Sequence, residues 1–168
     1  YNGIAYPATL SATASNLGNL GGLTLQYGGI FSTDATIPLN VPITIGTTSG
    51  TLSIAQNTTL TLPSTISSTS DNSTLYVQGG GTLSVTGTNS DFKGNWAVEE
   101  NSTLNISIAS NLGSSQSLTL TSGTLGVQGN LSTQQSLILE GYPTISVSSG
   151  NTASFSSLDT TALSSFTK

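Results

Sequence analysis

Short runs of alternating apolar and polar residues constrain this chain more than any other feature of its sequence. Clusters of small and turn-forming residues separate the runs, as in the segment 47–50. Alternation with a period of two is typical of a β-strand that buries one face, and such clusters form turns. We therefore expect an all-β chain with minimal helix. The apolar members of the runs are Leu23, Leu25, Tyr27, Leu39, Val41, Ile43, Ile45, Leu52, Ile54, Leu60, Leu62, Leu75, Val77, Leu83, Val85, Trp96, Val98, Leu104, Ile106, Ile108, Leu118, Leu120, Leu125, Val127, Leu137, Leu139, Ile145 and Val147.

Two short phrases repeat along the chain. One has the form Gly-Thr-Leu-x-aliphatic and occurs at 50–54, 81–85 and 123–127. The other has the form Asn-x-Thr-Leu-x-aliphatic and occurs at 57–62, 72–77 and 101–106. The two phrases repeatedly lie side by side, so that their leucines are eight positions apart. Paired short strands at a recurring offset predict two sides of one coil in a solenoid.

The distance between phrases of the same form varies. It is 31 positions from Leu52 to Leu83 and 42 from Leu83 to Leu125. We interpret these distances as coils of about 20 residues, with loops inserted in some of them. The 168 residues then form a single domain of roughly eight coils, about 40 Å long at the ~4.8 Å spacing of strands. A β-sandwich or jelly roll is the alternative, because short alternating strands occur there too.

The composition excludes several partners. Charged residues make up 5% of the chain, and the net charge is −5. No basic stripe is present that would bind nucleic acid or an anionic membrane surface. No apolar run approaches the ~20 residues of a membrane-spanning helix, and without Cys there are no disulfides or thiolate sites. Because the sequence opens at Tyr1 without an initiator Met or secretion signal, we expect a fragment or a processed product.

The most distinctive stretch is 80–96, Gly-Gly-Thr-Leu-Ser-Val-Thr-Gly-Thr-Asn-Ser-Asp-Phe-Lys-Gly-Asn-Trp, followed by Val98 and the phrase at 101–106. It resembles the strand repeat of autotransporter passengers, in which a Gly-Thr-Leu strand, an Asn-containing turn and an aromatic-x-Gly element precede another short strand. The resemblance covers about residues 79–108. It implies a right-handed parallel β-helix, with residues 1–168 as a single segment of a larger passenger. It also implies export through the outer membrane and display at the cell surface.

The polar and glycine residues of this stretch have a physical interpretation of their own. Gly87 and Gly94 are expected to take positive φ at corners of the coil. Asn89 and Asp91 are expected to form side-chain turns with their own backbone.

The two aromatic residues of the stretch are expected to pack. Phe92 and Trp96 should stack inside the coil or cover it, because burial is the commoner use of a large aromatic side chain. Contact between Trp96 and a sugar is the alternative.

The sequence offers little for catalysis. It contains no His, which excludes a Ser-His-acid triad and imidazole metal sites. The adjacent Glu99 and Glu100 suggest a glycosidase pair, but neighbours in a strand point to opposite faces. With no Arg, only Lys93 and Lys168 are available to neutralise the uronate of a polysaccharide lyase. We predict that the chain is not an enzyme and has no catalytic, cofactor-binding or metal-binding residues.

Other polar features have simpler interpretations. Asp71 and Asp91 offer oxygen ligands for calcium, but the run at 79–81 lacks the Asp of the calcium-binding nonapeptide repeat and is expected to be a flexible corner. The glycosylation sequons at Asn57, Asn72, Asn101, Asn105 and Asn130 have meaning only in a eukaryotic host. Two Thr-x-Thr triplets, at 59–61 and 119–121, are too few for the flat array of an ice-binding surface.

These observations predict a non-enzymatic stalk or adhesive module at the cell exterior. The expected partner is a host surface receptor, a glycan or another copy of the chain, without nucleic acid and without membrane insertion. Because charge is scarce, binding should use a lateral face and hydrogen bonds more than ion pairs. The alternative is a carbohydrate-binding module, or a part of a glycan-active surface protein whose site lies elsewhere.

Overall fold

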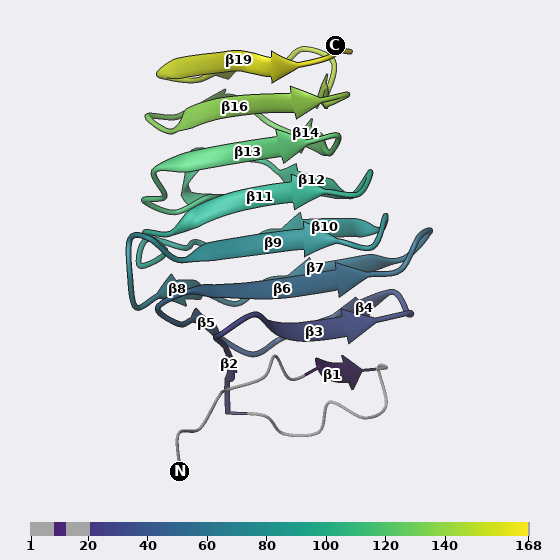
Figure 1. Cartoon of the computed structure of the whole chain (residues 1–168), viewed down its shortest axis with the longest axis vertical. Coiled ribbons are helices and arrows are strands. Elements are labelled where there is room, and N and C mark those ends of the chain that lie inside the picture. Colours follow the sequence, from purple (N-terminus) through teal and green to yellow (C-terminus); the bar gives the residue numbers. More distant parts are fainter. Residues whose placement is uncertain (1–8, 13–20, 168) are drawn as a thin grey trace.

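The chain folds as a parallel β-solenoid in a computed structural model that describes residues 9–12 and 21–167 (Figure 1). Every pairing between strands is parallel and joins elements about one coil apart in sequence. The described residues complete about seven turns, against the roughly eight expected, and their helical content is the 3-10 turn η1 (Ala109–Asn111). The all-β prediction is confirmed, and parallel stacking excludes the sandwich.

The strands form four sheets on three sides of the coil. The front sheet, which faces the viewer in Figure 1, contains β1 (Thr9–Ala12), β3 (Gly29–Thr33), β6 (Ser49–Ile54), β9 (Thr74–Gln78), β11 (Asn95–Glu99), β13 (Ser117–Thr121), β16 (Ser136–Gly141) and β19 (Ser157–Leu163). The back sheet contains β4 (Ile37–Pro38), β7 (Thr59–Leu62), β10 (Thr82–Val85), β12 (Thr103–Ile106), β14 (Thr124–Val127) and β17 (Thr144–Val147). The side sheets are β2 (Leu23–Leu25), β5 (Ile43–Ile45) and β8 (Ile66–Ser68), and β15 (Leu131–Ser132) with β18 (Ala153–Ser154).

The coil is right-handed. In Figure 1 the front strands run from left to right, the chain returns behind them, and successive coils rise from the N-terminal to the C-terminal end. Successive coils occupy 19 to 25 residues in the front-sheet register from Ile30 to Asp159. The offset of eight therefore joins a front strand to the back strand of the same coil, as from Leu52 in β6 to Leu60 in β7.

The repeated phrases do not mark equivalent positions, which corrects the sequence interpretation. The Gly-Thr-Leu phrase at 50–54 lies in the front sheet, whereas those at 81–85 and 123–127 lie in the back sheet. The 31 positions from Leu52 to Leu83 therefore join a strand of the front sheet to a strand of the back sheet in the next coil. They do not represent one coil with a long inserted loop. The reason is local: strands of both sheets begin after a turn and bury the residue that follows a Thr or Ser.

Apolar side chains fill the interior in columns that run along the axis. One front column consists of Phe31, Leu52, Val77, Val98, Leu120 and Leu139, and one back column of Ile37, Leu60, Leu83, Leu104 and Leu125. All of these side chains are at most 2% exposed. Burial of each contributes about 1.5–3 kcal/mol relative to an exposed side chain, so the columns are the main source of stability.

Left-handed backbone marks the corner between the front and back sheets. Asn57, Asn101 and Ser122 adopt φ of 64°, 58° and 56° there, and Gly79 and Gly80 adopt 93° and 79°. One or two left-handed residues reverse the chain sharply at each of these corners without breaking the stack. The segment 79–81 is therefore a corner, as expected.

The side sheets are interrupted in the middle coils, where two buried asparagines join the coils. Asn89 Oδ1 accepts the N–H of Ile66 at 2.7 Å, and Asn89 Nδ2 donates to the carbonyl of Asn111 at 2.6 Å. Asn111 Nδ2 in turn donates to the carbonyl of Gly87 at 2.9 Å. The prediction of a local side-chain turn at Asn89 is wrong, because its amide takes the place of the missing hydrogen bonds between strands.

Gly87 and Gly94 are also corrected. Neither adopts positive φ. A Cβ atom at Gly87 would meet the carbonyl oxygen of Ser64, and one at Gly94 would lie 2.6 Å from that of Ser73. Close approach of the preceding coil, rather than a left-handed corner, explains these two glycines.

Candidate interaction surfaces

The two adjacent glutamates have structural partners. Glu99 ends β11 and accepts a hydrogen bond from Gln78 Nε2 at 2.8 Å. Glu100 lies in the corner with φ of 55° and accepts the N–H of Gly79 at 3.1 Å. Each carboxylate thus bonds to the preceding coil, Glu99 from the end of a strand and Glu100 from the turn that follows it.

Trp96 is a core residue. It is fully buried and lies edge-to-face with Phe92, with 5.2 Å between the ring centroids. Its Nε1 donates to the carbonyl of Leu112 at 3.0 Å, so its only polar atom is satisfied. The packing prediction for both aromatic residues is confirmed, and Trp96 has no free face for a sugar.

The other oxygen-rich positions lie mostly at exposed turns. Asp71 and Asp91 are exposed, and within the described ranges no three acidic side chains gather as they would around a metal ion. Among the sequon asparagines, Asn57, Asn72, Asn101 and Asn130 are exposed, whereas Asn105 is half-buried in β12 of the back sheet.

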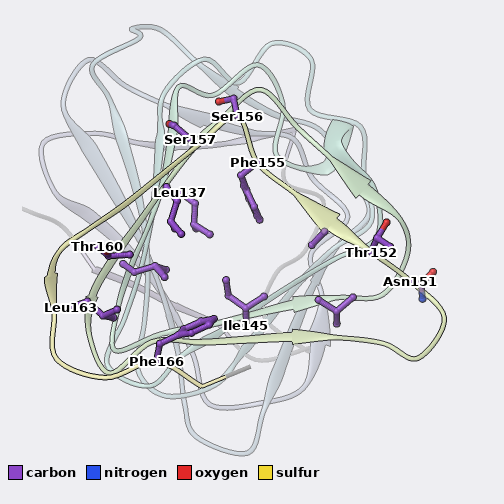
Figure 2. A pocket seen from close by; sticks show the side chains of 14 residues that line it. Leu137, Ile145, Asn151, Thr152, Phe155, Ser156, Ser157, Thr160, Leu163 and Phe166 are labelled. Atoms are coloured by element: carbon purple, nitrogen blue, oxygen red, sulfur yellow. The ribbon is translucent and has the colours of Figure 1, made fainter.

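The interior is open at the C-terminal end. A hollow of about 690 Å³ lies there, lined by the last members of the inward columns. Figure 2 shows Leu137, Ile145, Phe155 and Phe166 within the outline of the last coil. Leu158 is 61% exposed beside them. The hollow has the character of an uncovered core, since its polar members are Ser, Thr and Asn without an acid or a base.

The outward side chains of the front sheet bond to one another along the axis. Ser117 Oγ donates to Asn95 Oδ1 at 2.9 Å, and Thr121 Oγ1 donates to Glu140 Oε2 at 2.9 Å. Ser157 Oγ donates to Ser136 Oγ at 2.7 Å. Three acidic residues, Glu99, Glu140 and Asp159, lie in strands of this sheet. The front face is therefore acidic, and many of its polar groups already have partners.

The back sheet differs, because one position is threonine in five consecutive strands. Thr59, Thr82, Thr103, Thr124 and Thr144 are in register across β7, β10, β12, β14 and β17. Thr36 extends this threonine row at one end, where its Oγ1 accepts the N–H of Thr59 at 3.1 Å, and Thr167 bridges to Thr144 at the other. The parallel outward row contains Thr61, Ser84, Asn105, Gly126 and Ser146. No strand of the back sheet contains a charged residue.

The sequence did not reveal the threonine row. The Thr-x-Thr triplets at 59–61 and 119–121 lie on different sheets, in β7 and β13. The sequence signal for the row was the Thr that precedes the first buried Leu of many phrases. Strands of the front sheet begin with the same Thr-Leu pair, so the signal does not identify the back sheet.

Within residues 9–12 and 21–167, no helix has the length and apolar character needed to cross a membrane. The chain matches no family model, and no curated protein or solved structure shows significant similarity to it.

Proposed function

We propose that residues 1–168 form one segment of a larger, surface-exposed and non-enzymatic β-helical passenger or stalk, which mediates adhesion or self-association. One observation supports this most: coils stacked in register turn small polar side chains into continuous rows on the lateral faces. Rows of hydrogen-bonding groups over several coils can form many individually weak contacts with a matching surface. The resemblance of residues 79–108 to autotransporter passengers supports export and display at the cell surface.

The absence of His, Arg and Cys from the sequence supports a non-enzymatic role. His is the most frequent general acid or base, and Arg is a common group for neutralising the charge that develops in a transition state. The adjacent carboxylates Glu99 and Glu100 bind the preceding coil instead.

Agglutination of beads coated with the purified chain tests this proposal. Coated beads are expected to bind one another, or beads coated with a glycan or matrix protein, whereas uncoated beads stay dispersed. Because few charges are present, raising the salt concentration should change agglutination little. The Leu158→Asp variant serves as the control for contact through the open end, since a charge there opposes burial. Absence of binding to every surface, or polysaccharide turnover that Glu99→Gln abolishes, would contradict the proposal.

The carbohydrate-binding alternative loses its main residue with the burial of Trp96. The well-exposed tyrosines of the described residues do not replace it as a platform. Tyr27 lies before β3 near the start of the solenoid, and Tyr142 lies after β16 near its end. Glycan therefore remains one possible ligand class in the bead assay rather than a separate function.

A further inference from the structure

We infer that the back sheet is the docking surface for a second copy of this chain, with the two threonine rows facing each other and the two solenoid axes antiparallel. This inference deepens the self-association part of the proposed function and rests on it. It follows from the hydrogen-bonding state, the charge and the spacing of the row.

The hydroxyl groups of the row are available for an external partner. Five threonines of the row are partly exposed, and their hydroxyl groups make no hydrogen bond to another residue in the described part of the chain. They are Thr59, Thr82, Thr103, Thr124 and Thr144. The front sheet behaves differently, since four of its side-chain pairs bond along the axis. A hydroxyl both donates and accepts a hydrogen bond, so a threonine row is complementary to a second threonine row.

Charge favours the same face. Two copies that each have a net charge of −5 repel one another, and contact between front sheets would bring Glu99, Glu140 and Asp159 of both copies together. The back-sheet strands contain no charged residue, so docking there brings no strand carboxylate into the contact, and Glu100, in the corner before β12, lies at its edge. Like charges placed face to face oppose association, which makes the back sheet the preferred contact.

The spacing of the row selects a second solenoid as the partner. The threonines repeat at the strand spacing of ~4.8 Å, and another copy has the same repeat, so every coil can contact a coil. A two-fold axis that runs along the strands, between the two sheets at Thr103, makes the solenoid axes antiparallel. It places Thr103, the central member of the row, opposite Thr103 of the partner. Thr82 then lies opposite the partner's Thr124, and Thr59 opposite the partner's Thr144. This is the self-complementary contact of a symmetric dimer.

The size of the face predicts a weak dimer. Seven threonines at ~4.8 Å and strands of four residues at ~3.3 Å give a patch of about 29 by 13 Å, or roughly 400 Å². Stable interfaces bury about 800 Å² on each partner. Association of this segment should therefore need high protein concentration, and it should strengthen as coils are added to the row.

Disulfide trapping tests the inference directly, because the chain has no Cys. The Thr103→Cys variant is compared at high concentration in a glutathione redox buffer with Thr119→Cys, a similarly half-buried threonine in β13 of the front sheet. We expect several-fold more disulfide-linked dimer from Thr103→Cys. A mixture of Thr82→Cys and Thr124→Cys should form the mixed dimer in preference to either homodimer.

A charged substitution provides the second measurement. Thr82→Asp placed in the Thr103→Cys background should lower the dimer to the level of Thr119→Cys, because the buried carboxylate would lack a partner. Both substitutions are at half-buried positions on the outer face of the back sheet, and circular dichroism checks that the fold is retained. End-to-end stacking separates the two copies of Thr103 by the full length of the rod, so it produces no such dimer.

Equal trapping at Thr103 and Thr119, or a Thr103 dimer that Thr82→Asp leaves unchanged, would overturn the inference. If beads agglutinate while trapping shows no preference, the proposed function stands and this docking face is wrong. If neither agglutination nor trapping occurs, both fail. If no dimer forms and Thr82→Asp abolishes glycan binding, the back sheet binds glycan. This result would also overturn the inference that its partner is a second copy.

Discussion

The middle coils and the last coil contain the same kinds of residue but differ in what covers them. Leu104, in the middle of the back sheet, is completely buried, whereas Leu158, in the final front strand, is 61% exposed. In the middle, even the gap in the side sheets is closed by Asn89 and Asn111. At the end, the inward side chains surround the open hollow shown in Figure 2. A coil of this protein therefore obtains its stability from neighbours on both sides, as expected for a solenoid.

The strongest test of this comparison is the same substitution at both places. Leu104→Ala should lower the free energy of unfolding by about 2–5 kcal/mol, because it removes buried methyl groups and leaves a cavity. Leu158→Ala should change it by less than about 1 kcal/mol, since this side chain is largely hydrated in the folded state. Urea denaturation of the two variants and the parent measures the difference. Equal losses would show that the end is as well covered as the middle.

The second test compares two asparagines that join coils. Asn89→Ala leaves the N–H of Ile66 and the carbonyl of Asn111 without partners in the interior, which should cost about 2–4 kcal/mol. Asn130 also accepts the N–H of the following coil, from Thr152 at 3.0 Å, but it is exposed. Asn130→Ala should therefore cost only about 0.5–1 kcal/mol, because water replaces the lost bond.

Hydrogen exchange locates the effect of these two changes. The amide of Ile66 should lose protection in Asn89→Ala, and that of Thr152 should change little in Asn130→Ala. If the amide of Ile66 keeps its protection, the side chain of Asn89 does not have the bridging role assigned to it.

The difference between these two asparagines also shows what the sequence could and could not predict. Strand positions and the offset of eight were predictable, because alternation and turn residues are local properties. The role of Asn89 was not, because its partners Ile66 and Asn111 are 23 and 22 residues away. Nothing local distinguishes an Asn that bonds its own turn from one that bonds the neighbouring coils.

The threonine row was hidden for a related reason. Its members depend on the register between coils, and the coils vary between 19 and 25 residues in length. The same Thr-Leu phrase also begins strands of the front sheet, as at Thr74 in β9. A repeat of constant length would have revealed the row, whereas a variable one requires the pairing of each strand.

A third, smaller effect should appear in solution behaviour rather than in stability. Leu158→Ser removes a large exposed apolar side chain from the open end and should leave the free energy of unfolding within about 0.5 kcal/mol of the parent. Concentration-dependent light scattering should decrease, because exposed apolar surface and unpaired strand edges promote association. The matched variant Ile108→Ser changes an exposed apolar residue away from the end and should leave scattering unchanged. Equal decreases in both variants would show that the molecules do not associate through the open end.

The smallest effect concerns Asp159, where the last coil departs from the register of the others. One extra residue enters β19 between the partners of Ile138 and Glu140, and Asp159 Oδ1 accepts the N–H of Thr161 at 2.9 Å beside it. This backbone hydrogen bond, followed by one from the Thr161 side chain, lowers the pKa of Asp159 below its ordinary value.

A carboxyl whose pKa is lower in the folded state stabilises the fold above its unfolded pKa, and this stabilisation disappears as the pH falls through the folded value. Because the side chain is fully exposed, solvent screens the interaction and the effect on stability should be the weakest of the four. The stability difference between the parent and Asp159→Ala should therefore shrink as the pH is lowered from 7 through the acidic range, and a carboxyl titration followed by NMR should give Asp159 a pKa below the ordinary value of an aspartate. An ordinary aspartate pKa for Asp159, or a stability difference that does not depend on pH, would show that this turn does not stabilise the charged carboxylate.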